Sequence, residues 1–436
     1  MKDAADRYRR LRARTHELFG MLDDAAYYDR PIHLRHPIVF YDGHLPGFAF
    51  NTLVRDALGG RSIDVRLETL FARGIDPAEF VPAGGDGEDG RWPSRDEVRA
   101  FTIEADRRVV AALESIDVTG PAAGAVGTIL EHEAMHQETL AYMWHRVPLE
   151  AKRRPAGYRP AVGEGSPPKQ EWIEVPAGCA TLGADRQQVA FGWDNEFPAL
   201  RVSVAPFLME RHDVTNARYL EFVEDGGYGD ERLWRPEDWR WIRGDHVERP
   251  IFWELHNGAW HWRGMFDLLP LPLSWPVYVS QAEASAFARW SGARLPTEGE
   301  YHRAAFGSAE GERPFPWGAE APAAAHGVFD FEQWDPAPVG SRAAGASAWG
   351  IDDLMGNGWE WTATPFAPFP GFTPMATYPQ YSADFFDGEH FVMKGASPVT
   401  ARELLRRSFR NWFRPRYPYV YASFRCVKDV TASSHG

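Results

Sequence analysis

The chain has 436 residues, which is too long for one ordinary domain and suits two or three. Hydrophobic residues make up 44% and charged residues 25%, a globular balance that excludes wholesale disorder. No apolar run approaches the roughly 18–20 residues of a membrane-spanning helix. The net charge of −14 disfavours a nucleic-acid-binding surface, which needs clustered Lys and Arg.

The cysteines and the first residues bear on the cellular compartment. Only two cysteines occur, Cys179 and Cys426, far apart in the sequence, so a disulfide framework is not expected. The segment 1–7 is charged and lacks the apolar core of a signal peptide. We therefore expect a cytoplasmic protein, and the sequence leaves an oligomer possible.

The first 155 residues carry helical periodicity, with apolar side chains recurring every three or four positions. The third of four predicted helices begins at Ser94, where Ser94 and Glu97 have the spacing of a capping box. The predicted helices cover about 4–24, 37–58, 94–113 and 126–144. Four helices with two longer connections predict a small up-and-down bundle.

The stretch from Glu150 to Pro168 is first charged and then rich in Pro and Gly, which predicts a linker over 156–169. Beyond it the sequence is rich in Trp, Gly and Pro, and it reads as short strands with helices at about 280–290 and 298–305. The predicted fold class is therefore α+β with two domains, a helical bundle over 1–155 and an irregular α+β domain over 170–436.

Histidines in the bundle form a candidate metal site. His132 and His136 are four positions apart in the fourth predicted helix, so both imidazoles project from one helix face. A third ligand could come from another helix, and His33, His36 and His44 all lie near the second one. His44 lies within an apolar run, where a buried imidazole needs a partner. Histidine suits Zn, Fe, Cu or Ni, so these residues alone do not name the metal.

The same string also satisfies H-E-x-x-H, the zinc-peptidase signature, with Glu133 as general base. This alternative needs a third ligand downstream. The nearest candidates, His145 and Glu150, are not at a familiar spacing. A peptidase would also leave residues 170–430 without a role.

Five ordered strings in the second half resemble the formylglycine-generating-enzyme fold, a C-type-lectin-like domain. They are Met209–Asn216, Arg294–Tyr301, Pro314–Gly318, Gly350–Trp361 and Phe424–Val427. The cysteine pair of the formylglycine generator itself is absent between Lys394 and Trp412, so that activity is not expected. A bundle with these histidines, followed by such a domain, resembles the non-heme iron sulfoxide synthases of ergothioneine biosynthesis and their ovothiol-forming relatives. Their bundle is of the DinB-like type.

This resemblance implies an oxidoreductase in which three histidines hold Fe(II). The enzyme would use O₂ to join the sulfur of a thiol to an imidazole carbon of hercynine, and it would oxidise that sulfur to a sulfoxide. Redox-inert zinc could not supply this chemistry. The resemblance assigns these roles: His44, His132 and His136 as iron ligands, Tyr378 as the donor of a proton or hydrogen, Tyr381 as a substrate contact, and Asn411 and Trp412 as the residues that hold the betaine end of hercynine.

Two departures from the family bear on the thiol. Members that accept γ-glutamylcysteine have Asp directly after Asn-Trp and Arg four positions further on, whereas this chain has Phe413 and Tyr417. We therefore expect plain cysteine as the favoured thiol donor. Its carboxylate would bind one of four arginines, Arg91, Arg95, Arg414 or Arg416.

Some relatives also have Gln just before the last iron ligand, where this chain has Met135. This moves the chain towards the cysteine-using or the ovothiol-type branch. The alternative function is therefore a 5-histidylcysteine sulfoxide synthase acting on histidine. Ovothiol-type enzymes usually carry a methyltransferase after the lectin-like domain, and the sequence ends shortly after Cys426, which modestly favours hercynine. A non-catalytic ligand-binding protein with a lectin-like domain is a further alternative, and it predicts that the three histidines need not converge.

Overall fold

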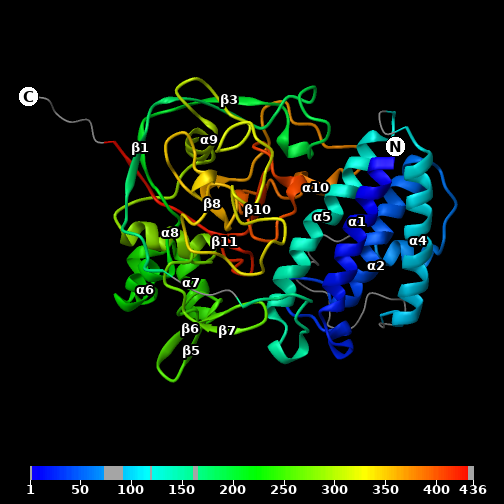
Figure 1. The fold of residues 1–436 in the computed structure, drawn as a ribbon, viewed down its shortest axis with the longest axis horizontal. Helices are drawn as coiled ribbons and strands as arrows, with labels where there is room; N and C mark the ends of the chain where they lie inside the picture. Colours follow the sequence, from blue (N-terminus) through cyan, green and yellow to red (C-terminus); the bar gives the residue numbers. More distant parts are fainter. Residues whose placement is uncertain (1, 73–91, 118–119, 161–164, 431–436) are drawn as a thin grey trace, which may run out of the picture. The chain divides into compact units, whose positions relative to one another are not determined.

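A computed structural model describes residues 2–72, 92–117, 120–160 and 165–430. The chain forms two compact units, Met1–Tyr158 and Arg159–Gly436. The first unit is helical and the second mixes short strands with helices, which confirms the predicted α+β fold class (Figure 1). Among the helices of the described residues, none combines the length and apolar composition needed to cross a bilayer.

Four long helices of the first unit, α1, α2, α4 and α5, run side by side as the predicted bundle (Figure 1). The second predicted helix consists of two parts, because α2 contains Pro46 and continues as a π-helical segment. The elements are α1 (Lys2–Gly20), η1 (Asp24–Tyr28), α2 (Ile38–Ala49), η2 (Phe50–Ala57), α3 (Val65–Leu70), α4 (Arg95–Ser115), α5 (Ala123–Arg146) and η3 (Leu149–Ala151). The short helix α3 was not predicted from the sequence.

The N-terminus of α4 begins where its capping residue predicts. The Ser94 side chain accepts a hydrogen bond from the backbone N–H of Glu97, with 3.3 Å between the atoms. The Glu97 carboxylate forms an ion pair with Arg66 of α3. Only one half of the predicted capping box is therefore present, and the other carboxylate interaction links α4 to α3.

A buried ion pair joins α1 to α5. Nη1 of Arg12 lies 3.0 Å from Oε1 of Glu133, and Nε of Arg12 donates to Oδ1 of Asp106 on α4 at 3.0 Å. Thr15 also donates to the Glu133 carboxylate. The Arg12 and Glu133 side chains are 6% and 1% exposed, so each charge depends on its partner rather than on water.

Replacing Arg12 with methionine is expected to lower the free energy of unfolding by about 3–5 kcal/mol, because Glu133 would keep a buried charge without its partner. Urea unfolding of the metal-free protein at pH 7 measures this loss. The matched control is the double variant Arg12→Met with Glu133→Leu, which removes both charges and should recover most of the stability. A single variant as stable as the wild type would contradict the assignment.

The strands described in the second unit form four small sheets. β8 (Gly358–Pro365) and β9 (Phe391–Ala396) pair antiparallel at the centre of the largest, with β10 (Asn411–Phe413) beside β9 and β11 (Ala422–Ser423) parallel to β8. The others are β1 (Trp172–Val175), β4 (Phe207–Glu210) and β12 (Val427–Asp429); β2 (Gly178–Leu182) and β3 (Leu200–Val204); and β5 (Trp253–His256), β6 (Ala259–Arg263) and β7 (Leu268–Pro270).

Helices of the second unit include the two predicted from the sequence, α8 (Gln281–Trp290) and α9 (Glu298–Phe306). Both begin with a complete capping box, at Ser280 and Thr297 respectively. Three further helices were not predicted: α6 (Asn216–Glu224), α7 (Pro236–Gly244) and α10 (Gln380–Ala383).

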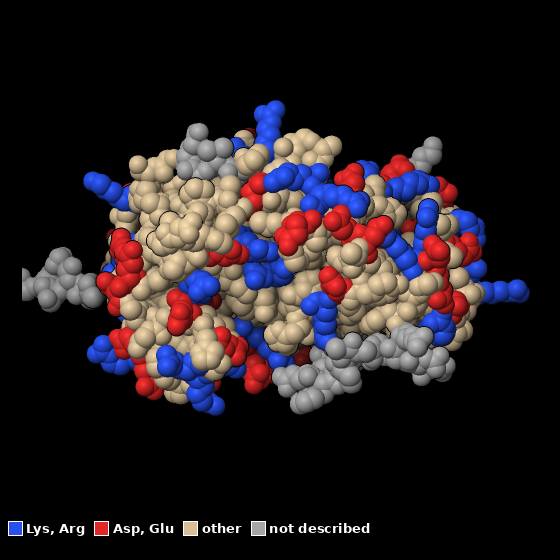
Figure 2. All heavy atoms as spheres, turned by 90° about the horizontal axis from the view of Figure 1, so that it is seen from below, with Lys and Arg blue, Asp and Glu red and all other residues tan. Residues whose placement is uncertain are grey.

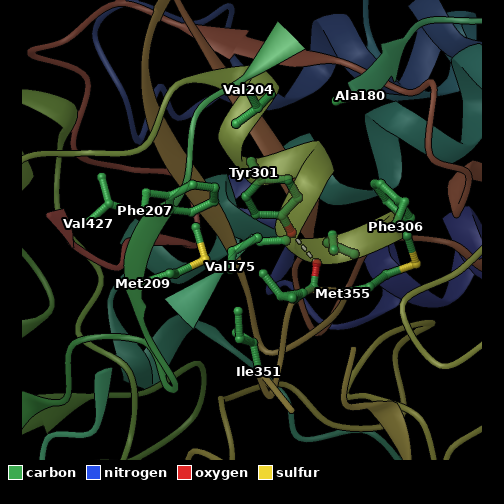
Figure 3. Packing of buried hydrophobic residues seen from close by; sticks show 14 of the residues in the cluster. Val175, Ala180, Val204, Phe207, Met209, Tyr301, Phe306, Ile351, Met355 and Val427 are labelled. Carbon is green, nitrogen blue, oxygen red and sulfur yellow. Dashed lines mark hydrogen bonds between the residues drawn. The ribbon is translucent and has the colours of Figure 1, made fainter. Parts of the chain in front are cut away.

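Tyr301 of α9 lies in an apolar core, where its ring packs among side chains of the β1–β4–β12 sheet and of 351–355 (Figure 3). The Tyr301 hydroxyl donates to the backbone carbonyl of Leu354. At the first turn of α9, Glu298 forms a buried bidentate ion pair with Arg410, with N···O distances of 3.0 and 3.1 Å. This ion pair fixes the chain immediately before Asn411 and Trp412 of β10.

Lys and Arg side chains are interspersed with Asp and Glu side chains on the face of the molecule in Figure 2. Neighbouring charges on one helix surface pair with one another, as Arg107 and Arg108 do with Glu104 at 2.7 and 2.6 Å. Such exposed pairs contribute about 0–1 kcal/mol each. Stability therefore depends chiefly on the apolar cores.

Candidate functional site

The three histidines of the predicted metal site converge inside the first unit. His44 comes from the middle of α2, and His132 and His136 come from adjacent turns of α5. One ring nitrogen of each lies within 4.8 Å of one ring nitrogen of the other two. Within the described ranges this is the one group of three or more His, Cys, Asp or Glu able to share a metal ion, and neither His145 nor Glu150 belongs to it.

The hydrogen bond of His44 sets which of its nitrogens is free to bind a metal. Nδ1 lies 2.7 Å from the backbone carbonyl oxygen of Phe71. Because a carbonyl only accepts, Nδ1 carries the proton and Nε2 presents a lone pair. Nε2 of His44 and Nδ1 of His136 are both buried and make no hydrogen bond with the described residues. A buried nitrogen without a partner is costly, and a metal ion at this site would relieve that cost for His44.

Burial also controls the charge of the three imidazoles. It lowers the pKa of His44 to about 4, and it lowers the pKa values of His132 and His136 well below their ordinary value. All three rings are therefore neutral near pH 7, which is the form that binds a metal.

Aromatic rings surround the histidines. Phe48 stacks on His132 with 3.6 Å between ring centroids, Phe40 stacks on His44 at 4.9 Å, and the ring of Tyr41 lies 5.8 Å from that of His136. Three imidazoles without a carboxylate fit a borderline divalent metal such as Fe or Zn. Because only three residues supply ligands, an octahedral ion would keep up to three positions for substrates.

Glu133 does not face this group. Its carboxylate is bound by Arg12 and Thr15 of α1, on the neighbouring face of α5. The general base of a zinc peptidase would have to lie beside the metal-bound water. In the H-E-x-x-H string, the two histidines therefore face His44, whereas Glu133 faces α1. The peptidase alternative is left without its general base.

Predicted substrate residues of the second unit gather in one aromatic cluster. Tyr381 stacks on Trp193 with 3.9 Å between centroids and meets Trp412 edge-on at 5.2 Å. Tyr378 lies 5.8 Å from Tyr381. Trp412 also stacks on Phe366, at 4.2 Å. The sequence-based choice of Tyr378, Tyr381 and Trp412 thus selects side chains that are neighbours in the fold.

A short turn at η4 (Asp194–Glu196) holds the segment that carries the two tyrosines. The Asp194 carboxylate accepts hydrogen bonds from the hydroxyl of Ser382 and from the backbone N–H of Met375, the latter at 3.3 Å. Asn195 donates to the Ser382 hydroxyl at 3.0 Å. These bonds fix both ends of the segment 375–382. Sequence reasoning missed Trp193 and Asp194, because no motif marks residues that act across almost two hundred positions.

Comparison with known proteins identifies the family. The model of the sulfatase-modifying factor enzyme 1-like domain matches residues 160–430, and the model of the DinB superfamily matches residues 7–140. The hercynine oxygenase of Mycolicibacterium smegmatis is 34% identical over 77% of this chain and 78% of that protein. That of Mycolicibacterium thermoresistibile is 38% identical over 70% of this chain and 69% of that protein. The chain belongs to this family of oxygenases.

A fungal relative shows how far the similarity extends. Ergothioneine biosynthesis protein 1 of Schizosaccharomyces pombe is 28% identical over 94% of this chain, and the chain covers 54% of that protein. The oxygenase thus spans about half the length of this relative. Both domain types that the sequence predicts, the DinB-like bundle and the formylglycine-generating-enzyme-like domain, are confirmed.

Two of the four arginines proposed for the thiol carboxylate already have acidic partners in the oxygenase. Arg95 lies 2.5 Å from Asp24, and its guanidinium stacks over the ring of Tyr27 at 4.9 Å. Arg416 lies 3.3 Å from Asp238. Arg414 is exposed, and Arg91 lies outside the described residues.

Asn411 uses its side chain locally, since its Oδ1 accepts a hydrogen bond from the backbone N–H of Trp412 at 2.9 Å. Next in the chain, the rings of Phe413 and Tyr417 stack with 5.0 Å between centroids and 17° between planes. The side chains of Phe413 and Tyr417 are therefore in direct contact.

Proposed function

We propose that this oxygenase is a Fe(II)- and O₂-dependent sulfoxide synthase of ergothioneine biosynthesis. Its substrates would be hercynine, cysteine and O₂, and its product would join the cysteine sulfur, as a sulfoxide, to an imidazole carbon of hercynine. The observation that carries the proposal is the convergence of His44, His132 and His136 in a chain related to hercynine oxygenases.

The three histidines would hold the iron through neutral imidazole nitrogens. Fe(II) bound there would supply the one-electron chemistry that O₂ requires and that zinc lacks. The rings of Phe40, Tyr41 and Phe48 would limit the access of water to the metal. Phe71 would keep the His44 ring in the tautomer that exposes Nε2, through the hydrogen bond at Nδ1.

The aromatic cluster of the second unit suits the betaine end of hercynine. A quaternary ammonium is recognised by aromatic rings, and the rings of Trp412 and Tyr381 meet edge-on with their centroids 5.2 Å apart. The Asn411 amide would add a dipole beside them. We assign Tyr378 the role of proton donor, through its phenolic hydroxyl, and Asp194 and Ser382 would hold the segment that carries it.

Cysteine is the proposed thiol because the Phe413–Tyr417 pair offers no charge to a γ-glutamyl group. The carboxylate of a bound cysteine would need a cationic partner. Of the described candidates, Arg414 is exposed and is next in the chain to Trp412 and Phe413. We therefore favour Arg414 for this role.

The direct test is a turnover assay with anaerobically iron-loaded enzyme, hercynine, cysteine and O₂, read by mass spectrometry. The expected product has the mass of both substrates plus one oxygen atom minus two hydrogen atoms, since the second oxygen atom leaves as water. Parallel reactions replace cysteine with γ-glutamylcysteine, and hercynine with histidine. Turnover of histidine but not hercynine would assign the chain to the ovothiol-type function, which Met135 before the last ligand would suit. No product from either, together with tight zinc binding, would refute the iron enzyme.

A further inference from the structure

One face of α2 carries two glycines a turn apart, Gly43 and Gly47, against which Phe71 packs. A Cβ atom built on Gly43 would lie only 2.3 Å from Cε2 and 2.4 Å from Cζ of the Phe71 ring. The ring therefore occupies the space that any side chain at position 43 would fill. A Cβ on Gly47 would lie 3.3 Å from the Phe101 ring and 3.4 Å from Cβ of Phe71, so it would need a shift of only a few tenths of an ångström and would leave the Phe71 ring free of any collision. The two glycines thus differ sharply in what a methyl group would displace.

Phe71 is held from several sides. Its side chain is 0% exposed, and its ring packs near Phe40 and Phe101 with centroids 6.1 and 6.0 Å away. Its backbone N–H donates to the carbonyl of Leu67 at 2.9 Å, because Phe71 caps the C-terminus of α3. The ring and the N–H hold the Cα atom and the carbonyl carbon of Phe71 in place, and with ψ at 8° its carbonyl oxygen lies against α2.

The Phe71 carbonyl accepts a hydrogen bond from His44, the residue that follows Gly43 in α2. Its oxygen lies 2.7 Å from Nδ1 of His44, while the ring of the same Phe71 lies on Gly43. One residue therefore touches two consecutive positions of α2, the glycine through its ring and the ligand through its backbone. Outer hydrogen-bond partners of this kind orient a metal-binding imidazole and select its tautomer.

We propose that Phe71 is a positioning residue for the metal site: its ring, seated on Gly43, sets the orientation and the tautomer of His44. The inference rests on the proposed function only in requiring that His44 bind a metal. It gives Gly43 a defined task, which is to leave room for the ring. It also couples α3 to the affinity of the site, since Phe71 caps the C-terminus of α3.

The test compares Gly43→Ala with Gly47→Ala. Both add one methyl group to the same helix and gain the same helix propensity, but only the first collides with the Phe71 ring. Dissociation constants for Fe(II) and Co(II) are measured without O₂ by competition with a chelator. Gly43→Ala is expected to weaken binding by about 10–100-fold, the usual cost of losing an outer partner, and Gly47→Ala should bind nearly as the wild type does.

A second measurement reads the tautomer without any metal. In protein labelled with ¹⁵N at histidine, His44 of the wild type should carry its proton on Nδ1, and Gly43→Ala should lose this preference. A purely structural role of Phe71 would lower the unfolding midpoint and leave the tautomer unchanged. Should Gly43→Ala fail to fold, Phe71→Leu, which keeps an apolar side chain without the ring, undergoes both measurements.

The outcomes separate this inference from the proposed function. The positioning role would be overturned if Gly43→Ala bound the metal with wild-type affinity and kept the Nδ1–H tautomer of His44. The same result in Phe71→Leu would overturn it if that variant is used. A wild type that binds no Fe(II) through the three histidines would overturn the proposed function. The tautomer measurement on metal-free protein would still decide the role of Phe71.

Discussion

Replacing His44 with alanine is expected to abolish tight Fe(II) binding and the turnover of hercynine. The variant removes one of three protein ligands and leaves His132 and His136 on a single helix, with no third nitrogen from α2. Loss of an outer hydrogen-bond partner alone costs about 10–100-fold in metal affinity, so loss of the ligand should cost more than about 100-fold. Anaerobic metal titration and the hercynine assay measure the two effects.

The matched control is His33→Ala. His33 is an exposed histidine shortly before α2, so its removal should change neither metal affinity nor turnover. Circular dichroism shows whether each variant keeps its helices, because removing a buried ring leaves a cavity beside Phe40. Full iron content and full activity in His44→Ala would disprove the three-histidine site.

The convergence of the three histidines could be anticipated from the sequence, because part of the signal is periodic. Four positions separate His132 from His136, and an α-helix turns that spacing into one face whatever the rest of the fold does. His44 is predictable for a different reason, since an imidazole within an apolar helical run must find a partner. The same periodicity explains Glu133: it is one position off the histidine stripe, so it faces Arg12 on α1.

Other parts of the site have no local signal. The hydrogen-bond partner of His44 is the backbone carbonyl of residue 71. Every amino acid has such a carbonyl, so the identity of the residue at this position does not reveal the interaction. Trp193 and Asp194 meet Tyr381 and Ser382 across a long separation in the chain, and neither belongs to a recognisable motif. Such contacts depend on the tertiary fold, which periodicity and spacing do not encode.

The helices that could be predicted from the sequence also differ from those that could not in the strength of their local signal. The long helices α1, α4 and α5 have enough turns for apolar periodicity to be visible, and α8 and α9 begin with complete capping boxes. By contrast, α3 has six residues, and α6 and α7 have nine each. In so few turns an apolar stripe contains only two or three residues, which is too little to distinguish it from a loop.

Substituting Asp for Phe413 together with Arg for Tyr417 is expected to shift the thiol preference towards γ-glutamylcysteine. The two rings are stacked with their centroids 5.0 Å apart, so a carboxylate and a guanidinium placed there would be neighbours. They would offer an acceptor to the ammonium group and a donor to the carboxylate of the γ-glutamyl moiety. One charge-assisted hydrogen bond contributes about 1.5–3 kcal/mol, so kcat/KM for γ-glutamylcysteine relative to cysteine should rise about 10–100-fold.

Both substitutions are needed, and this makes the test specific. Tyr417 is 3% exposed, so Tyr417→Arg without Phe413→Asp opposite it would place a buried, unpaired charge in the second unit and should destabilise it. A cycle of the wild type, both single variants and the double variant separates this coupling from the effect on the substrate. The uncharged double variant Phe413→Asn with Tyr417→Gln is the matched control, because it adds polarity without charge. An unchanged thiol preference in a stable charged variant would place the recognition of the thiol elsewhere, and equal gains in both double variants would show that polarity rather than charge decides it.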